Sequence, residues 1–347
     1  MRLNPLTVKK INRFKSIRRG YVSLIAVVIL LVLAAFAELL VNSRALVVRY
    51  DGEFYFPTYG SMISGTTFGF DYEYETDYRA LKERVRDEPG NWVLMPPVPY
   101  NPYENASPGE FVRPRPPDWS KQHFLGTDVQ NRDILARLVY GFRNVMLFAF
   151  GFVFGVYLLG IVIGCAMGYF GGWFDLIVQR LVEIWSNIPF LYTIILVASI
   201  FEPNLLLLML IMIAFSWTSM TYYMRTGTFK EKARDYVAAA QVQGASTARI
   251  IFSHILPNII STLVTFLPFL MASAITSLTA LDFLGYGLPE PTPSWGEMLR
   301  QGTERLKIAP WITLSAFSAT TLILILITFV GEAIREAFDP KRFTVYR

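Results

Sequence analysis

The sequence predicts an all-α polytopic membrane protein with six transmembrane helices and one large insert between the first and the second. Three observations predict this fold class. The chain is 53% hydrophobic and 17% charged, with a mean hydropathy of +0.38, whereas soluble domains carry about 25% charged residues. Apolar runs of about 20 residues recur, long enough to cross a hydrocarbon core of roughly 30 Å. Residues 42–143 differ sharply, with 12 basic and 14 acidic side chains.

The positive charge of the chain is concentrated at its beginning. Residues 1–20 contain seven Lys or Arg and no acidic residue, and the net charge of the whole chain is +5. The remainder is therefore slightly acidic, which argues against a nucleic-acid partner. A basic segment directly before an apolar run predicts a cytoplasmic N-terminus.

The first membrane helix is expected at residues 21–41. A cleavable signal peptide is the alternative, with Ala35, Phe36 and Ala37 as a cleavage site, but the run is long and further spans follow. Glu38 lies near the end of the run, as expected of an interfacial carboxylate. Residues 42–143, rich in proline and aromatic residues, are expected to form a folded extracytoplasmic insert, since long loops translocate largely regardless of charge.

A membrane core of five further spans is expected at residues 144–331. These are predicted at residues 144–168, 177–200, 205–224, 259–281 and 311–331. In the first of the five, glycines recur every four or five positions, which predicts close helix packing. The span at 177–200 is the least regular, because Glu183 and Pro189 interrupt it. This topology places a loop at 225–258 and the tail at 332–347 in the cytoplasm.

The chain contains few residues of the kinds that carry out covalent catalysis or bind transition metals. The chain has two histidines, His123 and His254, and one cysteine, Cys165, and it contains no phosphate-binding loop and no serine-nucleophile motif. We therefore expect no catalytic residue, no metal and no cofactor bound by this chain.

The loop at 225–258 carries the most specific pattern. A short helix is predicted from Asp235 to Gln243, with almost no side-chain bulk at Ala238–Ala240, and Gly244 is expected to end it. A second helical stretch follows from Ser246 to Leu256. Small residues beside a glycine turn would let a partner approach the backbone closely, although an ordinary surface hairpin has the same composition.

Three alanines, Gly244 and the Leu256-Pro257 pair together resemble the EAA loop of ABC importer permeases. In that family, the loop supplies the coupling helix that contacts the ATPase. Ala238 replaces the usual glutamate here, and His254 replaces an isoleucine, as in the peptide-transporting branch. The resemblance implies ATPase contact by the following set of residues: Asp235, Ala238, Ala239, Ala240, Gly244, Ala245, Leu256 and Pro257.

A second segment resembles the motif that precedes the second span in dipeptide and oligopeptide permeases. Its members, whose role the resemblance leaves open, are His123, Gly126, Thr127, Asp128, Arg132 and Asp133, with Arg137 beyond them. Asn131 stands where that motif has glycine. From the residues alone, Thr127 and Asp128 would instead be helix caps. Residues 281–296 and 332–342 resemble later segments of the same family, and residues 48–57 and 91–94 of the insert resemble its YejE-type members, which belong to importers of peptides and microcin C.

The resemblance implies an importer of several subunits in the inner membrane of a bacterium. A second, different permease subunit would complete the pathway through the bilayer, two ATPase domains or one tandem ATPase would use ATP, and a periplasmic binding protein would deliver oligopeptide. The insert could dock that protein, cap the pore or act as a brace. Two other classes remain: a secondary transporter or channel working alone, disfavoured by the lack of carboxylates in mid-span, and a membrane scaffold whose insert binds another protein.

Overall fold

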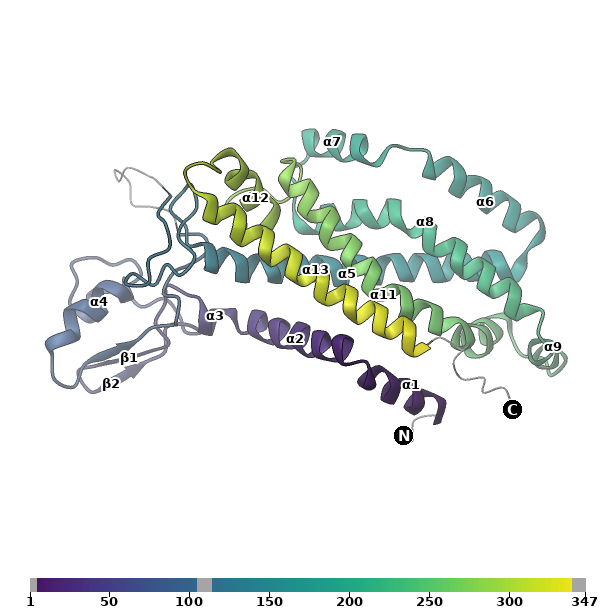
Figure 1. Ribbon diagram of the computed structural model, residues 1–347, viewed down its shortest axis with the longest axis horizontal. Coiled ribbons are helices and arrows are strands. Elements are labelled where there is room, and N and C mark those ends of the chain that lie inside the picture. Colours follow the sequence, from purple (N-terminus) through teal and green to yellow (C-terminus); the bar gives the residue numbers. More distant parts are fainter. Residues whose placement is uncertain (1–4, 105–113, 339–347) are drawn as a thin grey trace. The chain divides into compact units, whose positions relative to one another are not determined.

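The computed structural model describes residues 5–104 and 114–338, and the chain is mostly helical (Figure 1). Arg2 of the basic segment and the Asp339-Pro340 pair lie outside the described residues. The helices before and after the insert are α1 (Pro5–Ser16), α2 (Arg18–Ala35), α3 (Ala37–Leu40), α5 (Ile134–Phe170), α6 (Gly172–Ser186), α7 (Phe190–Ile200), α8 (Leu205–Lys232), α9 (Asp235–Val242), α10 (Thr247–Arg249), α11 (Leu256–Phe283), α12 (Trp295–Glu304) and α13 (Pro310–Phe338). A π-helical segment, η3 (Ile250–Ile255), joins α10 to α11.

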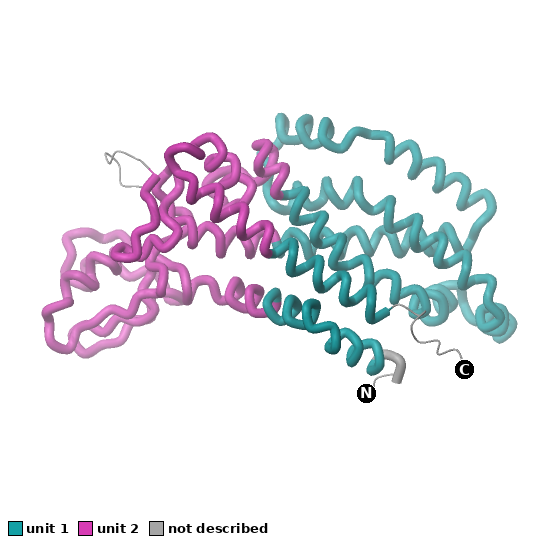
Figure 2. The backbone as a smooth tube through the Cα atoms, in the orientation of Figure 1, with its two compact units in different colours: residues 1–27, 146–278, 323–347 teal, residues 28–145, 279–322 magenta. Residues whose placement is uncertain are grey.

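The chain divides into two compact units (Figure 2). Unit 1 comprises residues 1–27, 146–278 and 323–347, and unit 2 comprises residues 28–145 and 279–322. The boundaries between the units fall within α2, α5, α11 and α13. Each unit therefore draws its residues from distant parts of the sequence.

Within the described residues, five helical stretches are long and apolar enough to cross a membrane, which confirms the predicted fold class. They are residues 18–35, 134–170, 205–232, 247–283 and 310–338. The span expected at 177–200 is a broken one, because α6 and α7 are bent by 68° at a short break. Pro189 at that break has no N–H to donate to the preceding turn, so a continuous helix would lose a hydrogen bond there. Counting the bent pair as one span gives six.

The glycines of α5 bring its backbone against α8 within unit 1. The row consists of Gly151, Gly155, Gly160, Gly164 and Gly168. A Cβ atom on Gly164 would lie 2.5 Å from the carbonyl oxygen of Thr221, and one on Gly168 would lie 2.6 Å from that of Arg225. Larger side chains would push the two backbones apart, so the row explains the close packing that the spacing predicts.

The polar insert has its own hydrophobic core in unit 2. It contains β1 (Val47–Tyr50), β2 (Glu53–Tyr55), β3 (Trp92–Leu94), η1 (Gly65–Phe68), α4 (Tyr78–Arg84) and η2 (Val85–Asp87). The three strands form an antiparallel sheet in the order β2-β1-β3. Val48, Phe68 and Leu81 are fully buried together. The Asp77 side chain caps α4 by accepting hydrogen bonds from the Arg79 and Ala80 amides.

Candidate functional site

The turn after α9 is built around a left-handed glycine. Gly244 has φ +77°, a conformation that costs other residues energy because of their Cβ atom. The Ala245 amide donates to the Ala240 carbonyl at 3.0 Å, and the Gly244 amide donates to the Gln241 carbonyl at 3.0 Å. These two bonds form a Schellman motif, which satisfies carbonyls that the helix end would leave free. The sequence therefore ends α9 where Gly244 predicts.

One face of α9 packs on its own chain and the other is open. Val237 and Ala240 are buried, and α9 contacts η3. Ala238 and Ala239 are exposed, and the Val242 side chain is 90% exposed. Apart from its two neighbours in the chain, no described residue has a heavy atom within 4 Å of a Cβ built on Gly244. The open side thus presents small and apolar residues, with Asp235 and Gln241 also exposed, and a partner could approach its backbone closely.

The other predicted residues of the loop line its two ends. Asp235 is exposed in the first turn of α9, where a carboxylate interacts favourably with the helix dipole. Ala245 is half-buried after the turn, and Leu256 and Pro257 begin α11, half-buried and exposed respectively. Of the eight predicted contact residues, Ala240 is the one that faces the interior of the chain.

A buried charge cluster lies in unit 2, formed by Asp128, Arg132, Arg137 and Glu297, and the exposed Glu290 lies at its edge. Arg132 Nε donates to Asp128 Oδ2 at 2.7 Å, and Arg137 Nη2 donates to Glu297 Oε2 at 2.8 Å. Asp128, Arg132 and Arg137 are completely buried. Burying charges is costly unless each is paired, so these contacts hold the start of α5 to α12.

The carboxyl group of Glu297, in the buried charge cluster, is hydrogen-bonded to that of Glu290 at the edge of the cluster. Burial raises the pKa of Glu297 to about 7, although the Arg137 guanidinium acts in the opposite direction. Burial acts on Glu290 in the same direction, but hydrogen bonds from the Glu297 carboxyl and the Gln130 amide outweigh it and lower the pKa of Glu290. Near neutral pH, the pair can therefore share one proton, with Glu297 as its carrier.

The cap of α5 is Asp133, not Thr127 or Asp128 as the residues alone suggested. Asp133 Oδ1 accepts a hydrogen bond from the Ala136 amide at 2.8 Å, and its Oδ2 lies 2.8 Å from His123 Nδ1. Asp128 instead accepts from the backbone and side chain of Arg132. The carboxylate three residues before Ala136 occupies the capping geometry, which leaves Asp128 free to pair with arginine.

Two tight backbone positions shape the segment before α5. Gly126 has φ +80°, and a Cβ there would lie 2.6 Å from the Arg115 carbonyl oxygen. Asn131 has φ +64° and accepts a hydrogen bond from the Thr127 hydroxyl at 3.2 Å. Asparagine tolerates the left-handed region better than most residues. This explains how Asn131 can stand where the resembling motif has glycine.

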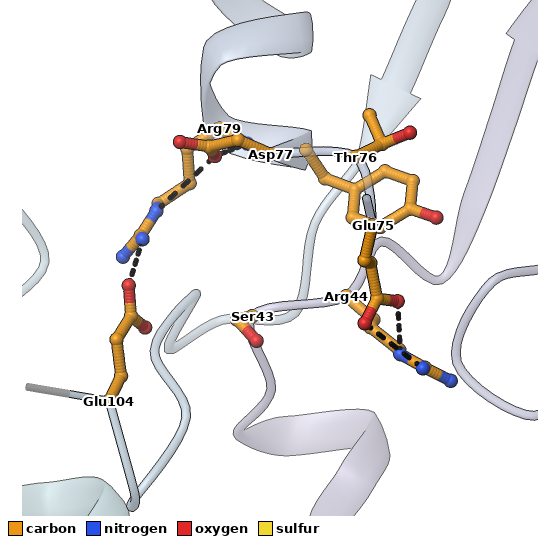
Figure 3. A pocket seen from close by; sticks show the side chains of 8 residues that line it. Ser43, Arg44, Glu75, Thr76, Asp77, Arg79 and Glu104 are labelled. Atoms are coloured by element: carbon orange, nitrogen blue, oxygen red, sulfur yellow. Dashed lines mark hydrogen bonds and ion pairs between the residues drawn. The ribbon is translucent and has the colours of Figure 1, made fainter. Parts of the chain in front are cut away.

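A cavity of about 230 Å³ opens in the insert (Figure 3). Arg44 Nε pairs with Glu75 Oε1 at 2.5 Å, and Arg79 pairs with Glu104. The Nη1 atoms of both arginines donate to carbonyl oxygens, including that of Pro99. Because their donors are committed to the insert itself, these arginines act as cross-links between segments distant in sequence.

Sequence reasoning missed several residues that the structure brings together. Glu297 was not singled out, although the Ser294–Glu297 spacing matches the start of a helix, and the Ser294 hydroxyl does accept from the Glu297 amide. Val242 was also missed, although an apolar side chain in a loop expected at the surface could have indicated a contact with a partner. Across the described ranges 5–104 and 114–338, no cluster of His, Cys, Asp and Glu could hold a metal ion.

Comparison with known proteins defines the class. Residues 160–344 match the family described as "Binding-protein-dependent transport system inner membrane component". The chain is 40% identical to the inner membrane ABC transporter permease protein YejE of Escherichia coli K12, over 98% of this chain and 99% of that protein. It is 36% identical to the peptidoglycan transport system permease protein YejE of Agrobacterium fabrum C58, over 98% of this chain and 94% of that protein. It is also 34% identical to the oligopeptide transport system permease protein OppC of E. coli K12, over 65% of this chain and 74% of that protein.

The chain belongs to the family of binding-protein-dependent transport system inner membrane components. The matched region includes the whole loop at 225–258. Within this family, the similarity to YejE extends through the insert and makes the chain an ABC importer permease of the YejE type.

Substitution of Asn131 tests its backbone role. Asn131→Val should lower stability by about 1–2 kcal/mol, because a β-branched side chain opposes a positive φ. Asn131→Gly should be close to the unchanged protein, since glycine adopts this conformation freely. Thermal unfolding of the purified protein in detergent measures both, and equal losses for the two variants would contradict the assignment.

Glu297 should make stability depend on pH. Its folded pKa of about 7 lies above the ordinary value of 4.5, so its contribution is complete below pH 4.5 and is lost as pH rises through 7. The apparent Tm should therefore fall between pH 5 and pH 8. In Glu297→Gln, which cannot ionise, that part of the slope should disappear; parallel curves for the two proteins would refute the assignment.

Proposed function

We propose that this chain is one permease subunit of an ABC importer for oligopeptides, and that the exposed face of α9 is its contact with an ATPase subunit. The open, apolar face at Ala238, Ala239, Val242 and Gly244 is the observation that carries the proposal. The substrate class follows from the peptide and peptidoglycan transport named for its relatives, and peptides of the microcin C kind fall within it.

In the proposed assembly, each subunit has a separate function. A second, different permease subunit completes the pathway, a periplasmic binding protein delivers the peptide, and two ATPase domains hydrolyse ATP. This chain binds no cofactor. Both of its termini and the loop at 225–258 face the cytoplasm, in agreement with the basic charge of residues 1–20 and of the loop. The α6–α7 pair then counts as one of six crossings.

Coupling requires that nucleotide-bound and nucleotide-free ATPases bind the two states of the permease with different affinity. The α9 face is the place where such a difference can act. Its backbone is approachable at Gly244, and Val242 offers an apolar anchor. Full burial of a valine side chain stabilises a contact by about 1.5–3 kcal/mol, which corresponds to a tenfold or larger change in affinity.

Substitution at Val242 tests this function. In the assembled complex, Val242→Asp should reduce affinity for the ATPase subunits at least tenfold, because it places a charge in an apolar contact. Uptake of an isotope-labelled peptide digest into proteoliposomes should be lost with it. Gly244→Trp should uncouple peptide uptake from ATP hydrolysis, because the bulky side chain keeps the ATPase away from the backbone of the turn.

The matched control is Val242→Leu, which keeps an apolar side chain and should retain both activities. Because Val242 is 90% exposed, Val242→Asp and Val242→Leu should insert into the membrane and unfold like the unchanged protein. Gly244→Trp should insert as well, with a stability lowered only by backbone strain at this position. Unchanged ATPase affinity and unchanged uptake in Val242→Asp and Gly244→Trp would reject the proposed contact.

A further inference from the structure

The Tyr236 hydroxyl joins three helices of unit 1. It donates a hydrogen bond to Glu231 Oε2 at 2.8 Å and accepts one from Asn258 Nδ2 at 3.1 Å. Tyr236 belongs to α9, Glu231 to the last turn of α8, and Asn258 to the first turn of α11. One oxygen atom thus connects the short helix of the loop to the two long helices that flank it in sequence.

The partners of this hydroxyl are themselves held in place. Asn258 donates its second amide hydrogen to the His254 carbonyl at 2.6 Å, so both of its N–H groups are used. His254 lies in η3, against which α9 packs through its buried side. The amide therefore has a fixed direction relative to the segment under α9.

A second, partly buried contact connects α8 to α6. Arg225 binds Asp175 of α6 through two parallel hydrogen bonds, Nε to Oδ1 at 2.5 Å and Nη2 to Oδ2 at 2.5 Å. Asp175 is buried, and bidentate arginine–carboxylate pairs constrain orientation as well as distance. Arg225 and Glu231 lie on the same continuous helix, so a displacement of its end is also a displacement of the pair that holds α6.

We propose that the Tyr236 hydroxyl is the joint that passes a displacement of α9 to α8 and α11. Tyr236 is a positioning residue: it need not touch nucleotide or peptide. The inference rests on the proposed function, because α9 must be moved by a partner. The buried contacts of Val237 and Ala240 keep α9 attached to η3, whereas the hydroxyl provides its hydrogen bonds to Glu231 and Asn258.

For a displacement to be transmitted through this contact, the equilibrium between its arrangements must depend on both of the elements that it connects. A merely structural hydrogen bond would change stability when removed. A joint would change the amount of peptide moved per ATP hydrolysed while leaving the assembly intact. The amount of peptide imported per ATP hydrolysed therefore distinguishes a joint from a merely structural hydrogen bond.

The experiment uses the complete importer in proteoliposomes, with the labelled peptide digest as the probe. Tyr236→Phe removes one oxygen atom and should lower peptide imported per ATP about fivefold or more, with unchanged thermal stability and ATPase affinity. Glu231→Ala should have a similar effect. Glu231→Gln keeps an oxygen acceptor for the tyrosine and should restore the ratio.

Tyr169→Phe is the matched control. Tyr169, in the last turn of α5, has a ring 5.3 Å from Lys232 Nζ, and its hydroxyl makes no hydrogen bond within the described part of the chain. This variant should keep the ratio of the unchanged protein. A double variant, Tyr236→Phe with Glu231→Ala, should be no worse than either single one, because both remove the same link.

The outcomes distinguish the joint from the proposed function. If Tyr236→Phe keeps the full ratio while Val242→Asp loses uptake in the same preparation, the joint is overturned and the contact of α9 stands. If Val242→Asp also keeps full uptake, α9 is not the coupling surface and both are overturned. A loss in Tyr236→Phe that comes with lowered stability also overturns the joint, as does a loss in Glu231→Gln as large as that in Glu231→Ala.

Discussion

The close contact between α5 and α8 is the constraint on which the rest of unit 1 depends. In a bilayer, the lipid tails are as apolar as the side chains, so helices associate through packing rather than through the hydrophobic effect. The five glycines of α5 allow that packing, because α8 side chains and carbonyl oxygens occupy the space a Cβ would fill. The last turn of α8 carries Glu231 and leads directly into α9. The position of the exposed loop is therefore set by a contact between two backbones.

The buried charge cluster is held by a different kind of interaction, in unit 2. Removing one partner from a buried ion pair costs about 3–5 kcal/mol, because the other charge is left without compensation. Nη1 and Nη2 of Arg132 make no hydrogen bond to any described residue, so this cluster is not an optimal source of stability. What it provides is geometry: Arg137 and Glu297, far apart in sequence, fix the start of α5 and the short helix α12 against each other.

The sequence predicted those features that depend on local signals. Long apolar runs identify spans because the bilayer sets their length, and Gly244 marks the end of α9 because a left-handed residue is needed there. Pro189 pointed to an interruption but not to a bend of 68°. The buried charge cluster could not be predicted in full, since no local pattern pairs Arg137 with a glutamate 160 residues away. The Asp133 cap was missed because three candidate capping residues lie close together, and backbone geometry alone distinguishes them.

The most direct test of the proposed contact is the accessibility of position 242 in the assembled importer. Cys165, the only cysteine of the chain, is buried, so a cysteine placed at Val242 would be the readily reactive thiol of this subunit. The rate of its alkylation by a water-soluble maleimide can be compared with and without the ATPase subunits. A contact between α9 and the ATPase predicts strong protection when the ATPase is bound. Equal rates in the two preparations would contradict it.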